Sequence, residues 1–385
     1  MTTLLVILCL TQIVLAAFVL VRMVRTARGT TLDPARSTVQ IGALSVIVPV
    51  LDEELRLARC LDGLIAHGPT VREILVVDGG SVDATRALIA AYAARDARVR
   101  LIDASPIPAI WNGKAWGLEC GLRASDGAST WILTVDADIS PRPGLAEALI
   151  GHARYVDVPA LSIATRQELG DWGEGLLHPA MLTTLVYRYG LPGHAFRDPA
   201  RVQANGQCFL ARRDIMLATD AFAIARASRC EDVTTARALA RAGHAVGFYE
   251  AGDLVVVRMH ANWRETWRNW PRSLTLRDQF TRRQSLRGLV EIALVQALPL
   301  PLAIVLSIVH PLGWQAQALL TVNTVLIMMR LGTLAGTVRA YTRPPWTYWL
   351  SPLADLPVTV ALIASAVRRT HTWRGRTLIS TGRIS

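Results

Sequence analysis

The stretch Trp131-Ile-Leu-Thr-Val-Asp-Ala-Asp138 decides how the rest of the chain is interpreted. Apolar and β-favouring residues are followed at once by two carboxylates with one residue between them, which is typical of a buried strand that ends at a polar site. Three similar runs precede it: Leu44-Ser-Val-Ile-Val-Pro49, Ile74-Leu-Val-Val-Asp78 and Val99-Arg-Leu-Ile-Asp103. Helical patterns stand between the runs, at residues 55–67, 82–94 and 114–124.

This alternation of strands and helices predicts an α/β fold with a doubly wound, Rossmann-like sheet. Such strands pair in parallel, and ligands bind beyond their carboxyl ends. Acidic residues stand at or just past several strand ends: Asp52, Glu53, Asp78, Asp136 and Asp138. Gathered carboxylates repel one another unless a cation or a hydrogen-bonding ligand is present. We therefore expect the functional site at this edge, although a single Asp at a strand end is commonly only a helix N-cap.

Beyond Asp138 the pattern is weaker. Residues 170–175 and 191–199 are predicted as loops around a helix. Short strands are predicted at residues 208–210, 246–249 and 254–257, and a clear helix at 233–242.

Four apolar stretches raise the hydrophobic share of the chain to 51%. The first, residues 3–21, is uncharged and close to the roughly 20 residues that cross a bilayer. Arginines follow it at positions 22, 25 and 28, an order that favours an uncleaved anchor with a cytoplasmic C-terminal side over a cleaved signal peptide. The other three stretches lie near the C-terminus, at residues 292–309, 319–329 and 349–367.

The apolar stretches and the α/β pattern predict six consecutive parts of the chain. They are a transmembrane anchor (1–24), a linker (25–42), a soluble α/β domain (43–260), an amphipathic or interfacial segment (261–288), transmembrane or re-entrant helices (289–370) and a basic tail (371–385). Three full C-terminal spans would put that tail outside the cell, against the positive-inside tendency. We therefore favour a cytoplasmic tail, with a re-entrant or interfacial piece marked either by Pro299 and Pro301 or by Pro352, Asp355 and Pro357.

The net charge of +11 comes from 41 basic and 30 acidic residues. Arginines concentrate beside the apolar stretches, so anionic lipid headgroups explain the charge better than nucleic acid, and we predict no nucleic-acid partner. Trp263, Trp267 and Trp270 stand among arginines, which indicates either an interfacial segment or a basic helix packed on the soluble domain. Lys114 is the one lysine of the chain, which suggests a site that needs a compact ammonium.

The acidic pattern resembles the motifs of family-2 glycosyltransferases. The matching motifs, in order, are Val48-Pro49, Asp52-Glu53-Glu54, Val77-Asp78-Gly79-Gly80-Ser81, Gly113-Lys114, Asp136-Ala-Asp138 and Glu231-Asp232. The resemblance spans residues 43–260 and implies the GT-A nucleotide-sugar-binding fold, with a mixed sheet and an inverting transfer from a nucleotide sugar, expected to be a UDP-sugar.

The flanking layout is similar to a membrane-bound branch of that family. The first span, Trp111-Asn-Gly-Lys-Ala-Trp116 and the C-terminal spans match it, and Asn205-Gly-Gln207 is similar to the carotenoid members. The branch includes bacterial carotenoid, hopanoid-associated and ceramide glycosyltransferases. It implies a multi-pass protein of the inner cell membrane, with a cytoplasmic catalytic domain and a lipid or isoprenoid acceptor.

The resemblance also implies a role for each matched residue. Asp232 would be the general base that deprotonates the acceptor, its alternative being a helix N-cap. Asp138 would ligate Mg²⁺ or Mn²⁺, with Asp136 as a second ligand. Glu53 and Asp78 would bind the nucleoside, within a donor site that comprises Pro49, Glu53, Asp78, Gly113, Lys114, Asp136 and Glu231.

Two departures from the family pattern limit the inference. Asp52 stands where the family usually has Asn, which puts a role for Asp52 in doubt. Processive polysaccharide synthases carry Gln-x-x-Arg-Trp, whereas this chain has Gln279-Phe-Thr-Arg282-Arg283, so a single sugar transfer is favoured. Arg282 is the candidate to face the diphosphate. A glycan-building transferase, a nucleotidyltransferase and a degenerate membrane scaffold remain as alternatives.

Overall fold

The computed structural model describes residues 2–37, 39–228, 230–274, 282–309, 313–367, 370–373 and 376–379. Internal contacts divide the chain into two units. The sheet unit consists of Gly29–Glu168 and Pro192–Met259. The helical unit consists of Met1–Arg28, Leu169–Leu191 and His260–Ser385.

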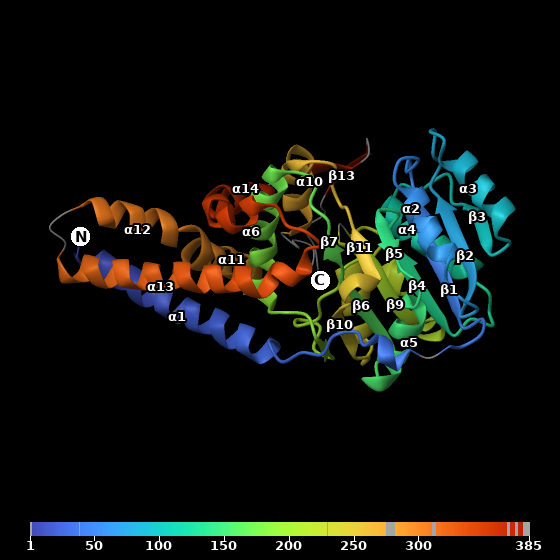
Figure 1. Ribbon diagram of the computed structural model, residues 1–385, viewed down its shortest axis with the longest axis horizontal. Coiled ribbons are helices and arrows are strands. Elements are labelled where there is room, and N and C mark those ends of the chain that lie inside the picture. Colours follow the sequence, from blue (N-terminus) through green and yellow to red (C-terminus); the bar gives the residue numbers. More distant parts are fainter. Residues whose placement is uncertain are drawn as a thin grey trace. The chain divides into compact units, whose positions relative to one another are not determined.

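The sheet unit is built on one eight-stranded sheet with the order β3-β2-β1-β4-β9-β6-β10-β8 (Figure 1). The strands are β1 (Leu44–Val50), β2 (Val71–Asp78), β3 (Val99–Asp103), β4 (Trp131–Val135), β6 (Ala160–Ala164), β8 (His194–Phe196), β9 (Cys208–Arg212) and β10 (Val246–Glu250). The first four run parallel, as predicted, and β6 and β10 are parallel to each other. Strand β9 is antiparallel to both β4 and β6, so the sheet is mixed.

Helices cover both faces of this sheet, which confirms the doubly wound architecture (Figure 1). One face carries α2 (Leu57–Ile65), α3 (Thr85–Arg95) and α5 (Leu145–Tyr155), and the other carries α4 (Gly113–Ala124), α7 (Arg213–Ala218), α8 (Ala221–Ile224) and α9 (Glu231–Arg241). The strand period explains the division, because successive side chains point to opposite faces. In β1, Val46 and Val48 join the core beneath α2, whereas Ile47 joins the core beneath α4.

The central pattern was weaker, and its predictions were confirmed only in part. The helix expected between the two loops is α6 (Trp172–Tyr189), but it begins inside the expected loop 170–175, where the Asp171 carboxylate accepts a capping hydrogen bond from Glu174 N at 2.8 Å. Residues 191–199 contain β8, which pairs antiparallel with β10. Helix α5 and strand β6 were not predicted. A three-stranded sheet of β5 (Ile139–Pro141), β11 (Val255–Val257) and β7 (Arg166–Gln167) completes the unit.

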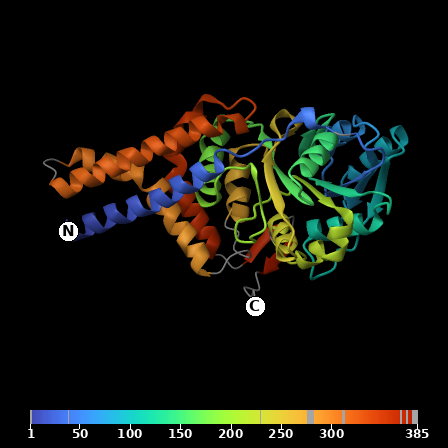
Figure 2. The ribbon, with the colours of Figure 1, turned by 90° about the horizontal axis from the view of Figure 1, so that it is seen from below.

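Among its described residues, the helical unit contains three helices that are long and apolar enough to cross a membrane, at Thr3–Thr26, Trp314–Ala340 and Trp346–Ala366. A fourth span is formed if Arg283–Ala297 and Pro299–Ile308 are counted together, although they bend by 43° at a break. Pro299 stands at that break, where it removes a backbone donor. Helices α1 (Thr2–Thr26) and α13 (Trp314–Thr337) run side by side in Figures 1 and 2. These helices are compatible with membrane association.

The unit also contains α10 (Trp263–Leu274), α11 (Arg282–Ile292), the π-helical turn η3 (Ala293–Ala297), α12 (Pro299–Ile308) and the 3₁₀ segment η4 (Val338–Ala340). The third candidate span consists of the 3₁₀ segment η5 (Trp346–Ala354) and α14 (Asp355–Val367). Two predictions fall partly outside the described residues. Positions 279–281 of the Gln279–Arg283 element and most of the basic tail at 371–385 are not described, nor is the side chain of Arg282.

Helix α10 carries the tryptophan-rich segment and packs on α6. Trp270 is buried, with its ring 4.0 Å from that of His178. Trp263 covers Gly173 so closely that a Cβ on that glycine would lie 2.6 Å from the indole. The Thr266 hydroxyl donates to Glu174 at 2.8 Å. Trp263 and Trp270 thus both contact α6, while the interfacial role of the segment stays a prediction.

A buried ion pair joins the C-terminal helices. The Arg330 guanidinium contacts both carboxylate oxygens of Asp355, at 2.9 and 3.1 Å, and the two side chains are 3% exposed. Gln296 donates to the same carboxylate at 2.8 Å, and Arg330 donates to Ser351 at 2.8 Å. Charged groups this deep in an apolar unit are tolerated only when paired, so the group ties α13, α14, η3 and η5 together.

We expect Arg330→Met to destabilise the purified protein by about 3–5 kcal/mol, because it leaves Asp355 buried without its cation. The double variant Arg330→Met/Asp355→Leu should recover most of that loss, since an apolar pair needs no compensation. Thermal unfolding of the two proteins measures the difference, with the exposed Arg268→Met as the control. An unchanged transition in the single variant would show that the pair contributes nothing to stability.

Candidate functional site

The candidate site lies at the edge of the main sheet where the carboxyl ends of β1, β2, β4 and β6 meet. Helix α4 precedes β4, and helix α9 precedes β10, which runs parallel to β6. A helix that leads into such a strand runs in the opposite direction to it, so the amino ends of both helices point toward the same edge. Because β9 is antiparallel, the loop before it arrives there as well. Helix amino ends carry partial positive charge, which favours anionic ligands at this edge.

Lys114 brings two of the predicted acidic residues together. Its ammonium lies 2.7 Å from Asp136 Oδ1 and 2.8 Å from Glu231 Oε1. Burial alone would lower the pKa of Lys114, but the charges of Asp136, Glu231 and Asp232 outweigh it and hold that pKa well above its usual value. The lysine therefore stays protonated and neutralises part of the acidic cluster. Asn112 caps α4 by accepting from the Lys114 amide at 3.0 Å, which fixes the start of the helix.

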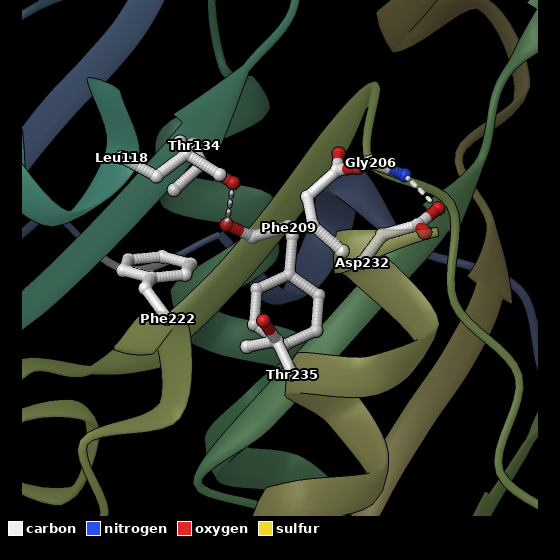
Figure 3. Close-up of a pocket in the computed structure, with 8 residues that line it drawn as sticks. Leu118, Thr134, Gly206, Phe209, Phe222, Asp232 and Thr235 are labelled. Carbon is white, nitrogen blue, oxygen red and sulfur yellow. Dashed lines mark hydrogen bonds between the residues drawn. The ribbon is translucent and has the colours of Figure 1, made fainter. Parts of the chain in front are cut away.

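Asp232 stands beside this cluster in the first turn of α9. Its carboxylate accepts from Gly206 N at 2.8 Å (Figure 3) and from Val233 N at 2.8 Å. Burial, reinforced by the charge of Glu231, raises the pKa of Asp232 to about 7 despite the nearby lysine. A carboxyl group with that pKa can accept a proton near neutral pH, as a general base must.

A small cavity beneath Asp232 explains part of this desolvation. Aromatic and aliphatic side chains form much of its wall, and Figure 3 shows the rings of Phe209 and Phe222 in it. The lining residues are Leu118, Thr134, Gly206, Phe209, Phe222, Glu231, Asp232 and Thr235. An apolar wall on one side of a carboxylate disfavours its charged form.

Asp138 is the residue that best fits a role as metal ligand. Its Oδ1 is buried and has no hydrogen-bond partner among the residues that the structure describes. Burial and the charge of Asp136 raise the pKa of Asp138 to about 7, although the charges of Lys114 and Arg56 act in the opposite direction. The described residues contain no group of three or more His, Cys, Asp or Glu side chains placed to hold a metal. Two carboxylates still fit Mg²⁺ or Mn²⁺, since such ions commonly take their other ligands from phosphate and water.

The other predicted donor residues occupy the neighbouring strand ends. Asp78 is the buried last residue of β2, and its carboxylate accepts from Ser81 Oγ and Arg86 Nε, both at 2.5 Å. Glu53 follows β1, with its amide bonded to Thr85 at 2.8 Å. The nucleoside-binding roles of Asp78 and Glu53 remain predictions.

Pro49 and Gly113 have positions that suit a supporting role. Pro49 lies on β1 against α4, where a Cβ on Gly117 would approach the Pro49 Cβ to 3.1 Å. That close packing sets the depth of α4 and therefore of Lys114. Gly113 is the first residue of the helix.

The position of Asp52 explains why the loop tolerates Asp where the family usually has Asn. Its φ is 54°, a left-handed conformation that Asn and Asp tolerate better than other non-glycine residues. Its carboxylate accepts from Val82 N at 2.9 Å. Either Asn or Asp can meet both requirements, so the exchange leaves the loop intact.

Several residues near the site were not assigned a role from sequence. Arg86 lies in α3, and it links Asp78 to Asp103 through contacts of 2.5 and 3.0 Å. Gly206 and Gln207 contact the acidic cluster through their backbone. The spacing of Arg86 eight residues after Asp78 carries no recognisable signal. The motif Asn205-Gly-Gln207 was recognised in the sequence, but its contacts with the acidic cluster could not be predicted, because they depend on the antiparallel direction of β9.

Comparison with known proteins agrees with this geometry. Residues 45–216 match the family described as glycosyl transferase family 2. This match runs from the second residue of β1 into α7 and includes Glu53, Asp78, Lys114, Asp136 and Asp138, whereas Glu231 and Asp232 lie beyond it. No curated protein matches the chain at a significant level.

The chain is also similar to several solved structures. A mannosyltransferase from Pyrobaculum calidifontis in complex with GDP-Man and Mn²⁺ is 18% identical, with a TM-score of 0.52 over 94% of this chain and 98% of that one. Glucosyl-3-phosphoglycerate synthase from Mycobacterium tuberculosis is 17% identical over 68% of this chain and 82% of its own, with a TM-score of 0.39. S. aureus TarS is 13% identical over 88% and 96%, with a TM-score of 0.40.

Of these three likenesses, the one to the Pyrobaculum calidifontis structure supports the fold, because its TM-score exceeds 0.5. At this identity it says nothing about the substrate. The similarity of residues 45–216 to glycosyl transferase family 2 identifies the chain as an enzyme, a glycosyltransferase, and the Pyrobaculum calidifontis structure supports its mixed α/β fold.

Proposed function

We propose that the protein transfers a single sugar, with inversion, from a nucleoside-diphosphate sugar to a hydroxyl or carboxyl group of a membrane lipid or isoprenoid. The observation that carries the proposal is the cluster in which Lys114 lies between Asp136 and Glu231 while Asp232 stands beside them. The cluster combines a protonated amine with an available base at one sheet edge, and the transfer requires both functions.

In the proposed step, an acceptor oxygen attacks the anomeric carbon of the sugar as the bond from that carbon to the diphosphate breaks. Asp232 takes the proton from the acceptor, and the nucleoside diphosphate leaves with the bonding electrons. Lys114 and the amino ends of α4 and α9 provide positive charge near the departing diphosphate. We expect a UDP-sugar as the donor.

Asp138, with Asp136, would hold a divalent cation in the loaded enzyme. Such an ion supplies positive charge to diphosphate oxygens, which is the chemistry that Mg²⁺ and Mn²⁺ commonly contribute to nucleotide sites. The unpartnered Asp138 Oδ1 supports this assignment. Asp136 would join only after yielding its contact with Lys114.

The helical unit supports a membrane acceptor. Its three candidate spans and the bent helix pair suit a multi-pass protein of the inner cell membrane. With the catalytic unit on the cytoplasmic side, the acceptor head group would be reached at the bilayer surface. Carotenoid or hopanoid intermediates are the acceptor classes that we favour.

The proposed function is tested by lipid analysis. We expect cells that make the active protein to contain a membrane lipid heavier by one sugar, detected by mass spectrometry, which cells with the Asp232→Asn variant lack. Purified enzyme should release nucleoside diphosphate from one of a panel of UDP- and GDP-sugars when membrane lipid extract is added. A long glycan product would contradict single transfer, and a pyrophosphate product would indicate a nucleotidyltransferase.

Asp232→Asn should lower the transfer rate by roughly 10²–10⁴-fold, because the amide cannot take the acceptor proton. UDP binding, measured by titration calorimetry with Mn²⁺ present, should change little, since the amide oxygen still accepts one of the two backbone hydrogen bonds. Asp214→Asn is the matched control, because Asp214 is an exposed residue of α7 paired only with Arg212 among its described contacts. Loss of UDP binding in the Asp232 variant would contradict its assignment as base.

The pKa of about 7 for Asp232 predicts a pH profile. The base acts only when ionised, so kcat/KM should be constant above about pH 8 and fall as the pH falls through 7, to roughly a tenth at pH 6. Protonation of Asp138, whose pKa is also about 7, should weaken metal binding over the same range. Raising the Mn²⁺ concentration separates the two, because added metal restores only the part lost through Asp138. A flat profile from pH 6 to 8 would exclude Asp232 as the base.

A further inference from the structure

The loop Asn205–Gln207, here termed the bridging loop, contacts both halves of the proposed site. Its Gly206 amide donates to Asp232 Oδ2 at 2.8 Å, and its Gln207 carbonyl accepts from the Asp136 amide at 3.2 Å. The bridging loop thus contacts Asp232, the proposed base, through Gly206. Through Gln207 it contacts the end of β4, which leads into the carboxylates Asp136 and Asp138.

Buried side chains anchor this loop to the end of β6. Ser162 Oγ accepts from Asn205 N at 2.7 Å and donates to Asn205 O at 2.9 Å. The Gln207 side-chain carbonyl accepts from Thr165 Oγ1 at 2.5 Å and from Asn205 Nδ2 at 2.9 Å. Ser162, Thr165 and Gln207 are all buried, so these hydrogen bonds do not compete with bulk water.

The bridging loop also packs closely against Lys114. A Cβ on Gly206 would lie 2.7 Å from Lys114 Nζ, 3.2 Å from Glu231 Oε1 and 3.3 Å from Asp232 Cβ. Gly206 does not adopt a left-handed backbone conformation, so space rather than φ requires the glycine. The loop therefore fits against the ammonium and both acidic residues of α9 at once.

We propose that Thr165 and Gln207 are positioning residues that hold the bridging loop so that Asp232 stays aligned with the donor bound near Asp136. They act through Gly206 and do not touch the reacting atoms. This inference rests on the proposed function, because it assumes that Asp232 is the base. Transfer rates are sensitive to such alignment, and a displacement of about 1 Å can lower a rate by roughly 10²-fold.

The test compares kcat with donor binding in three variants. Thr165→Val removes the hydroxyl at nearly constant volume, Gln207→Met removes its acceptor, and Thr165→Ser keeps the hydroxyl. We expect kcat to fall by roughly 10- to 100-fold in the first two. UDP affinity and the donor KM should stay within about threefold, and Thr165→Ser should recover most of the rate. Thr219→Val is the control, because the Thr219 hydroxyl bonds only the backbone of its own helix among the described contacts.

Three results would overturn the inference. The first is a kcat within twofold of the wild type in both Thr165→Val and Gln207→Met. The second is an equal loss in Thr165→Ser and Thr165→Val, which would indicate packing and not the hydrogen bond. The third is a parallel loss of UDP binding and melting temperature, which would indicate general disruption.

Asp232→Asn, assayed in parallel, separates this inference from the proposed function. A fully active Asp232→Asn would overturn the base assignment itself. An inactive Asp232→Asn together with a fully active Thr165→Val would overturn the positioning role alone.

Discussion

The contact of the Lys114 ammonium with Asp136 and Glu231 is the interaction on which the site depends. Removing a carboxylate from water costs several kcal/mol, whereas a helix amino end returns only about 0.3–1 kcal/mol. The dipoles of α4 and α9 are therefore too weak to hold this acidic cluster together. A buried cation is required, and in a chain that otherwise uses arginine the compact ammonium is the group that fits between two carboxylates.

The reversal of direction at β9 determines what surrounds this cation. A wholly parallel sheet would place only the loops that follow strands at the acidic edge. Because β9 runs antiparallel between β4 and β6, the segment that precedes it reaches the same edge. Gly206 thereby comes to face Lys114 and Asp232, although more than 90 residues separate it from the lysine in sequence.

The sequence allowed the elements of the first half of the sheet unit to be predicted to within about three residues, because β1, β2 and β4 are apolar runs with acidic residues at or just past their ends. Prediction from the sequence failed beyond Asp138, where apolar runs followed by acidic residues no longer occur. Asp171 was not recognised as the cap of α6, so the first turn was assigned to a loop. In the site, Lys114, Asp136 and Asp232 carried recognisable motifs. Thr165 did not, because its role arises from a neighbour across the sheet and not along the chain.

Helix α6 has a consequence for how the chain can be made and divided. It interrupts the sheet unit between β7 and β8, yet it belongs to the helical unit, whose C-terminal helices begin only at Trp263. During synthesis α6 emerges more than 70 residues before α10, so Gly173, Glu174 and His178 lack their α10 partners until then. The catalytic sheet therefore has no clean boundary at which it can be excised, because a fragment ending at Met259 would keep α6 and its partner α1 but lose the C-terminal helices that cover the rest of α6.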